Sequence, residues 1–279
     1  MKKISRRSFL AAAGLSVAAL ALTACGGSSA STASSVASSA ASSEVASTSA
    51  AAGELTTVEA GKLTMATNAA FPPYEMTTDA GEFEGIDIET AQAIADKLGL
   101  ELQIDDMDFD AALLSVQQGK ADIVMAGVTV TDERKAVMDF SDSYATGIQS
   151  IIVPEGSDIA SPDDLAGKKI GTQRGTTGYI YCSDDFGDDN VVAYDDGLTA
   201  VQALNNGQVD AVVIDNAPAK EFVAANPGLV ILDTSYAEED YAIGMAKGSS
   251  LEDAVNATLE ELKADGTLQA IVDKYITAE

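Results

Sequence analysis

The chain has 279 residues, a net charge of −28 and neither histidine nor tryptophan. The lack of histidine excludes Ser-His-Asp triads, histidine-dependent zinc fingers and other catalysis that relies on an imidazole. The first 24 residues hold four basic and no acidic residues, so the rest of the chain is more acidic still and repels nucleic acid and anionic lipid.

Residues 1–24 predict an export signal. The stretch "MKKISRRSFL" is positively charged, and the apolar run "LAAAGLSVAALALTA" is shorter than the roughly 20 residues that span a bilayer. "LTAC" at residues 22–25 resembles the lipobox of bacterial lipoproteins, which predicts a lipid on Cys25; the alternative is an ordinary signal peptide with an incidental cysteine. The adjacent arginines in "SRRSFL" leave the general secretory and the twin-arginine routes open.

Residues 25–54 predict a tether between this lipid and a globular part. Residues 26–53 are almost all Ser, Ala, Thr and Gly and contain nothing large enough to pack. The segment is therefore expected to hold the globular part outside the cytoplasmic membrane. The second cysteine, Cys182, has no obvious partner and is interpreted as a small core residue, with a reactive thiol as the alternative.

From residue 55 onward, strands and helices alternate. Strands are predicted at 62–67, 100–104 and 121–127, with helices at 86–99 and 109–119 between them. Both helices end at a glycine, the usual helix stop. This βαβαβ order predicts an α/β fold with a largely parallel sheet.

A second unit of similar build follows. Strands are predicted at 168–173, 191–194 and 209–215, with helices after "GTTGYIYC" and at 197–207, and two more helices at 250–266 and 267–276. The stretch "LLSVQQGKADIVMAG" in the first unit matches "AVQALNNGQVDAVVID" in the second in its order of helix, glycine, aspartate and apolar strand. Two lobes of similar construction are expected.

Ligands of open α/β sheets bind beyond the carboxyl ends of the strands, and the first such end is "TNAAFPPYE". Its two prolines stop regular structure and hold Phe71 in a loop. A loop aromatic beside a strand end can form a stacking wall for a ligand. The alternative is a ring folded back on the core.

The second strand end is "AGVTVTDER". Gly127 exposes a backbone N–H, Thr129 offers a hydroxyl, and the threonine that opens "TDER" is expected to cap a helix. Arg134 would then stand in a first turn, where the helix dipole opposes it unless it faces an anion. The alternative is a surface salt bridge to Asp132 or Asp139.

The third group combines "QRGTTG" with "VVIDNAP". The segment 175–178 opens a helix after a strand and could cradle an anion, or its threonine could be an ordinary N-cap. Asp215 ends an apolar run and there needs a cation, unless it is itself an N-cap of a helix beginning near Pro218.

Eight motifs in this order carry a family resemblance: "TNAAFPPYE", "GIDIETAQAIADKLG", "FDAALLSVQQGKADI", "AGVTVTDER", "DFSDSY", "IGTQRGTTG", "GQVDAVVIDNAPA" and "ELKADGTLQAIVDKY". From about residue 62 to 276 the chain resembles the bacterial extracellular solute-binding proteins of family 3, the receptors for polar amino acids that serve ABC importers. The resemblance implies that Arg134 clamps the α-carboxylate of the ligand, assisted by Gly127, Thr129 and Thr177. It also implies that Asp215 takes the α-ammonium.

For the ligand side chain, the resemblance implies a sandwich between Phe71 and Phe109. Receptors of this kind that prefer basic side chains often carry an acid where this chain has Asn68. Asn68 and Gln173 therefore suggest a neutral polar or mixed preference, although Glu75 and Glu239 could also reach the side chain.

The implied architecture is the type II periplasmic-binding-protein-like fold, two α/β lobes joined by a two-strand hinge. Lobe 1 would comprise 55–144 plus 243–279, and lobe 2 would comprise 148–238. The expected protein is a lipid-anchored monomer on the extracytoplasmic face that delivers a polar amino acid to an ABC permease, without cofactor, metal, nucleic acid or catalysis. The rival is an exported dehydratase of the same fold that acts on cyclic hydroxy acids, with Glu75 or Asp215 as the acid.

Overall fold

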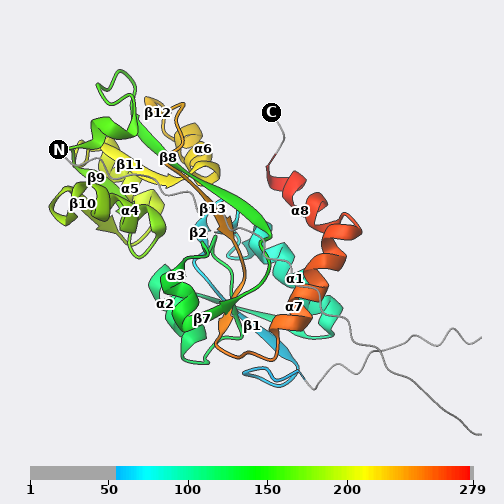
Figure 1. The fold of residues 1–279 in the computed structure, drawn as a ribbon. Helices are drawn as coiled ribbons and strands as arrows, with labels where there is room; N and C mark the ends of the chain where they lie inside the picture. The colour runs from blue at the N-terminus through cyan, green and yellow to red at the C-terminus, as the bar shows by residue number, and fades with distance from the viewer. Residues whose placement is uncertain (1–54, 277–279) are drawn as a thin grey trace, which may run out of the picture. The chain divides into compact units, whose positions relative to one another are not determined.

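The computed structural model describes residues 55–276, and two mixed sheets organise them (Figure 1). The predicted signal segment, the lipidation site at Cys25 and the tether lie outside the described residues. The first sheet has the strand order β5-β1-β6-β14-β7 and contains β1 Lys62–Thr67, β5 Glu101–Asp106, β6 Ile123–Val124, β7 Met138–Phe140 and β14 Gly244–Ala246. A small antiparallel sheet joins β2 Ala70–Phe71, β3 Glu75–Thr77 and β4 Phe83–Glu84.

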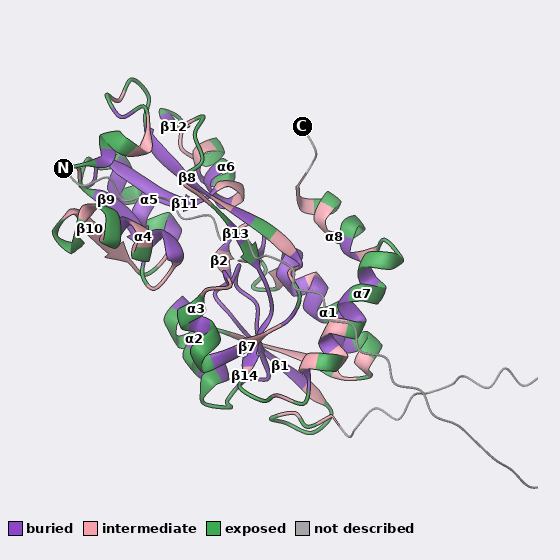
Figure 2. Cartoon of the chain, viewed as in Figure 1, coloured by how far each residue is buried: buried purple, intermediate pink, exposed green. Residues whose placement is uncertain are grey.

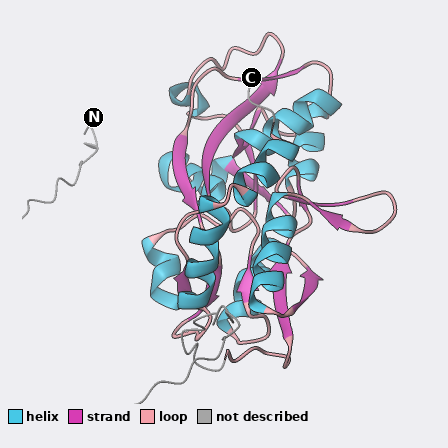
Figure 3. Ribbon diagram, turned by 90° about the vertical axis from the view of Figure 1, so that its right-hand side faces the viewer, coloured by secondary structure: helices cyan, strands magenta, loops and turns pink. Residues whose placement is uncertain are grey.

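Helices cover both faces of the first sheet. This sheet and its helices together are called the first lobe. Strands β5, β1 and β6 are parallel, whereas β14 is antiparallel to β6 and β7. Side chains of β1 alternate between the faces: Leu63 and Met65 join the core under α1, and Ala66 joins the core under α2. The covering helices are α1 Ile86–Leu98, α7 Glu252–Ala264 and α8 Thr267–Tyr275 together, and α2 Phe109–Gln117 (Figures 1 and 3).

The second lobe is built on the sheet with order β10-β9-β11-β8-β12, in which β13 also pairs with β8. Its strands are β8 Ala145–Pro154, β9 Ile170–Gln173, β10 Val191–Tyr194, β11 Ala211–Asp215, β12 Leu229–Ile231 and β13 Ala237–Tyr241. Its helices are α4 Thr177–Phe186, α5 Gly197–Asn205 and α6 Asn216–Ala225, with 3₁₀ turns at Pro162–Leu165 and Asp188–Asn190. The central strands of both sheets are mostly buried, the edge strands β5 and β10 are at most partly buried, and the outer faces of the helices are exposed (Figure 2).

Most predicted elements are confirmed, with small shifts at their ends. Helix α1 stops before Gly99, whose left-handed backbone (φ 69°) lets its N–H bond back to Ala95. The strand predicted at 121–127 pairs only at β6, because the chain after Val124 turns away at Gly127 (φ 54°). Cys182 is fully buried in the core beneath α4, as predicted, and burial raises the pKa of its thiol to about 12.

Two strands carry the chain between the sheets. After β7 of the first sheet the chain enters β8, and it returns from β13 to β14. β8 and β13 pair antiparallel from Ala145 opposite Tyr241 to Gln149 opposite Ala237. Within residues 55–276, no helix combines the length and the apolar character that a membrane span requires.

Candidate functional site

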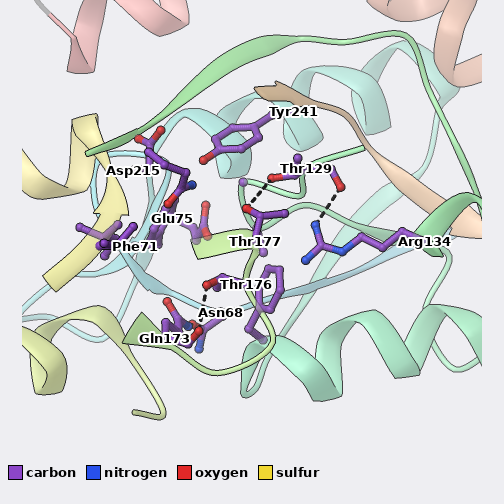
Figure 4. Close-up of a pocket in the computed structure, with 16 residues that line it drawn as sticks. Asn68, Phe71, Glu75, Thr129, Arg134, Gln173, Thr176, Thr177, Asp215 and Tyr241 are labelled. Atoms are coloured by element: carbon purple, nitrogen blue, oxygen red, sulfur yellow. Dashed lines mark hydrogen bonds between the residues drawn. The ribbon is translucent and has the colours of Figure 1, made fainter. Parts of the chain in front are cut away.

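One pocket brings all the predicted ligand-binding residues together (Figure 4). The predicted residues that line it are Asn68, Phe71, Phe109, Gly127, Thr129, Arg134, Gln173, Thr177 and Asp215. The remaining lining residues are Glu75, Ala126, Gln149, Thr176, Val213, Ile214 and Tyr241. A cavity of about 20 Å³ remains among these side chains, which is room for a single water molecule.

Arg134 stands in the first turn of α3 Asp132–Val137, as predicted, and Thr131 caps that helix by accepting a hydrogen bond from the Arg134 N–H at 3.2 Å. The side chain is buried. Its Nη1 donates to the Thr129 carbonyl at 2.8 Å and its Nη2 to the Gly175 carbonyl at 3.1 Å. Asp139, offered as a surface partner in the alternative, pairs with Lys247 at 2.6 Å. The guanidinium therefore faces the pocket.

The contact at Gly175 joins the two lobes, since the Arg134 side chain of one donates to the main-chain carbonyl of the other. Gly175 precedes α4 in the second lobe and has a left-handed backbone (φ 73°). A Cβ at this position would overlap the carboxylate of Asp110, which lies on α2 of the first lobe. The left-handed backbone favours glycine here, and the missing Cβ leaves room for the Asp110 side chain where the lobes meet.

Two threonine hydroxyls meet beside Arg134. Oγ1 of Thr129 in the first lobe lies 3.3 Å from Oγ1 of Thr177 in the second (Figure 4). The helix cap expected in this loop is Thr176, whose hydroxyl accepts from the Tyr179 N–H at 3.4 Å. Because Thr176 takes the capping role, the Thr177 hydroxyl is left to face the first lobe.

Asp215 lines the pocket and also caps a helix. Its Oδ1 accepts from the Ala217 N–H at 2.9 Å, the N-cap bond of α6, and its Oδ2 accepts from the Ile148 N–H at 2.8 Å. Burial raises the pKa of Asp215 to about 6, although these two N–H groups favour the charged form. The N-cap alternative is therefore present, but the helix begins at Asn216 rather than near Pro218.

The aromatic walls are packed on both sides. The ring of Phe71 stacks on Tyr74 with centroids 5.8 Å apart and an interplanar angle of 22°. A Cβ at Gly127 would lie 2.9 Å from the Phe71 ring, so the glycine lets that ring close on the strand end. Phe71 thus contacts the core and still lines the pocket, and both sequence interpretations describe part of its environment.

Asn68 and Gln173 bond to each other across the lobes. The Gln173 Nε2 donates to the Asn68 Oδ1 at 2.8 Å, and the Asn68 Nδ2 donates to the Met107 carbonyl at 2.9 Å. Both side chains are buried. Much of their hydrogen-bonding capacity is therefore taken up within the protein.

A buried acid pair, Glu75 and Asp87, lies at the pocket; the sequence offers Glu75 as a candidate contact of the ligand side chain and assigns Asp87 no role. Glu75 is fully buried, and no donor among the described residues reaches either of its carboxyl oxygens. Asp87 lies next to it; its Oδ2 accepts from the Gly127 N–H at 3.1 Å and the Tyr144 hydroxyl at 2.8 Å. Burial, reinforced by the neighbouring acid, raises the pKa of Glu75 well above its usual range, and burial raises that of Asp87 to about 6.

A further buried acid, Glu239, lies behind the threonines on β13. Its Oε2 accepts from the hydroxyls of Thr129 (3.1 Å) and Thr177 (3.0 Å) and from the Gln149 Nε2 (2.9 Å). Its negative charge also counteracts the lowering of the Arg134 pKa that burial causes. Within residues 55–276, no group of three or more His, Cys, Asp or Glu side chains is arranged to hold a metal ion.

Comparison with known proteins places the chain among receptors. Residues 63–278 match the family described as bacterial extracellular solute-binding proteins, family 3. The L-cystine-binding protein TcyJ of Escherichia coli (strain K12) is 33% identical over 226 residues, which are 79% of this chain and 85% of TcyJ.

Two solved structures have the same fold. The arginine-, lysine-, histidine-binding protein ArtJ from Geobacillus stearothermophilus is 34% identical, with a TM-score of 0.75 over 78% of this chain and 96% of its own. An ancestral arginine-binding protein bound to glutamine is 41% identical, with a TM-score of 0.75; the match covers 78% of this chain and 99% of the ancestral protein. The predicted type II fold of two α/β lobes is confirmed, and the chain belongs to family 3 of the bacterial extracellular solute-binding proteins.

Proposed function

We propose that this protein is an extracellular amino-acid receptor that closes around its ligand and delivers it to an ABC importer, without catalysing a reaction. One observation carries the proposal: Arg134, Thr129 and Thr177 converge in a pocket whose wall also contains the carboxylate of Asp215. An α-amino acid carries a carboxylate and an ammonium on one carbon. A guanidinium with two hydroxyls suits the first group, and a buried aspartate suits the second.

In this proposal the Arg134 fork transfers its bonds to the ligand. The fork now donates to two neutral carbonyl oxygens, those of Thr129 and Gly175. A carboxylate is a stronger acceptor for a guanidinium than a carbonyl, and it can take both arms at once. Asp215 would keep its two backbone donors and add the ligand ammonium, which compensates the charge that burial disfavours.

Entry of the ligand requires the lobes to part. The remaining space of about 20 Å³ is far smaller than an amino acid, and the pocket wall comes from both sheets. We propose the lobe boundaries expected from the sequence, 55–144 plus 243–279 and 148–238, with the crossings near 145–147 and 239–242 as the hinge. Contacts from both lobes would make the bound ligand favour the closed form.

For the ligand side chain we propose a cationic group, in place of the neutral preference suggested by Asn68 and Gln173. Those two amides bond to each other, whereas Glu75 offers two buried oxygens that no donor within residues 55–276 reaches. A guanidinium supplies several donors and a positive charge. In support, the similar ancestral proteins are described as arginine-binding, one solved with arginine and one with glutamine.

The family is extracellular by its own description, and we propose that this member is a lipid-anchored monomer. The lipid would be carried by Cys25, and residues 26–53 would be the tether to the globular part. A permease in the same membrane would receive the ligand from the closed form.

The proposed function is tested by calorimetric titration of the purified globular part with the twenty common amino acids, after partial unfolding and dialysis to remove co-purified ligand. At least one α-amino acid should bind, and L-arginine should bind more tightly than L-glutamine. Binding of no amino acid would refute the receptor proposal. Turnover of prephenate or arogenate would instead support the dehydratase alternative.

A further inference from the structure

Glu239 connects three parts of the molecule through one oxygen atom. Its Oε2 accepts hydrogen bonds from Thr129 of the first lobe, Thr177 of the second lobe and Gln149 of the crossing strand β8. The other oxygen, Oε1, is buried and has no hydrogen-bond partner among the described residues. The carboxylate thus stands on the hinge strand β13 and contacts both lobes.

The number of hydroxyl hydrogens limits how many acceptors the two threonines can bind. Each threonine hydroxyl has a single hydrogen to donate. With both hydrogens directed at Glu239, the Thr129 and Thr177 oxygens present only lone pairs to the pocket. A ligand carboxylate is itself an acceptor only, so it can bind these hydroxyls only when they turn away from Glu239.

We propose that Glu239 is an internal competitor of the ligand α-carboxylate: both carboxylates require the same two hydroxyl hydrogens, and Glu239 thereby weakens ligand binding. The inference rests on the proposed function, because it takes Thr129, Thr177 and Arg134 as the carboxylate site. The negative charge of Glu239 also weakens ligand binding, because it offsets the attraction of Arg134 for an anion and repels the ligand carboxylate.

The same contacts give Glu239 a role in closure before the ligand arrives. A carboxylate that accepts from both lobes at 3.0 and 3.1 Å favours the closed arrangement. When the ligand binds, its carboxylate replaces the Glu239 carboxylate as the acceptor of the two hydroxyls where the lobes meet. Glu239 therefore sets the difference in free energy between the empty closed form and the loaded closed form.

The test is Glu239→Gln, which keeps the shape and replaces the charged acceptor of the threonine hydrogens by a weaker neutral one, with Glu238→Gln as the matched control on the exposed face of the same strand. Calorimetric titration of Glu239→Gln with L-arginine should give a Kd lower by about fivefold or more, and the factor for L-glutamine should be similar because the α-carboxylate is shared. L-Argininamide, which lacks the carboxylate, should show no gain. The Kd values of the control should match those of wild type.

Several outcomes would overturn the inference. Weaker binding of L-arginine and L-argininamide alike would make Glu239 a partner of the ligand ammonium or a support for the threonines. An equal gain for both ligands would indicate a general charge effect rather than competition. Glu239→Met, which is similar in length and has no hydrogen-bonding group, should give the same gain for L-arginine as Glu239→Gln. Circular dichroism checks that both variants fold.

The proposed function and this inference fail separately. A wild-type protein that binds neither L-arginine nor L-glutamine would contradict the proposed function and, with it, the competition. A wild-type protein that binds them, but whose Glu239→Gln and Glu239→Met variants both show no gain, contradicts only the competition.

Discussion

The guanidinium carbon of Arg134 lies 5.3 Å from the centre of the Phe109 ring, within the range of a cation–π contact. Phe109 begins α2, and Arg134 stands on α3 of the same lobe. The ring face supports the planar side chain, and carbonyl groups hold its two arms. The fork is therefore oriented before a ligand reaches it.

Arg134→Ala should abolish amino-acid binding while leaving the fold intact. Removing one partner of a buried charged pair costs about 3–5 kcal/mol, and Lys should restore little because it lacks the planar fork. Calorimetric titration measures the loss. Arg174→Ala is the control, since Arg174 is exposed and contacts Asp195 and the Ala193 carbonyl, each at 3.4 Å, outside the pocket. Near-normal affinity of Arg134→Ala would move the carboxylate site elsewhere.

Asp215→Asn should lower both ligand affinity and stability. Loss of the charge opposite the ammonium should cost about 2 kcal/mol in binding. The single oxygen of the new amide can still accept from the Ala217 N–H and cap α6. The NH₂ group of the amide would then face the Ile148 N–H, so two donors would meet. This should lower the free energy of unfolding by about 1–2 kcal/mol. Urea denaturation and titration together check this. Loss of stability with unchanged affinity would leave Asp215 only the capping role.

Glu75→Gln should change ligand preference. If the Glu75 carboxylate pairs with a cationic ligand side chain, loss of the carboxylate should weaken the binding of L-arginine by about 2 kcal/mol. The binding of L-glutamine should stay nearly unchanged. Glu84→Gln, at an exposed acid nearby, serves as the control. Because the pKa of Glu75 is raised well above its usual range, binding of L-arginine near pH 7 should also release a proton. Titrations in buffers of different ionisation enthalpy detect that release, and its absence would contradict the pairing.

The stability of the free protein should rise when the pH falls from 7 to about 5. Burial raises the pKa of Asp87 and of Asp215 to about 6, above the value of about 3.9 for an unfolded aspartate. Between these values the folded state binds more protons than the unfolded state, so lower pH favours folding. Exposed acids with lowered pKa, such as Asp164, lose their stabilising effect only below about pH 4.

Urea denaturation at pH 7 and pH 5 measures this effect. Asp87→Asn should reduce the gain between the two pH values, because one of the titrating groups is gone. A free energy of unfolding that is unchanged or lower at pH 5 would show that these carboxyls do not titrate as the structure indicates.

Cys25 should be the lipidated first residue of the mature protein. Intact-mass analysis of the membrane fraction should show acyl mass on a chain that begins at Cys25, and Cys25→Ala should release the protein from the membrane. A mature chain that begins at another residue would refute the lipoprotein assignment.

Local signals made most of the fold predictable, because helix ends and short strands depend on nearby residues. Gly99 ends α1 where a left-handed glycine was expected, and the strand predicted at 191–194 has the bounds of β10. The structure also gathers the nine predicted site residues around one pocket. Their roles toward a ligand remain predictions.

The acids behind the pocket depend on contacts that the local sequence does not encode. Asp87 has the position of an ordinary first-turn acid, and only its contacts with Gly127 and Tyr144 bury it in the centre of the lobe. In "AEEDY" three acids follow one another, and the sequence alone does not indicate which of them points inward. The register of β13 on β8 turns Glu239 inward and leaves Glu238 and Asp240 exposed.

The close approach of Gly175 to Asp110 brings the two lobes together at a point that lies outside the pocket lining. Neither of these two residues lines the pocket, whereas Phe71 and Glu75 do and would discriminate ligand side chains. A permease that docks over this edge would sense that the lobes have met, whichever amino acid lies between them. One importer could then accept every ligand that the pocket wall admits.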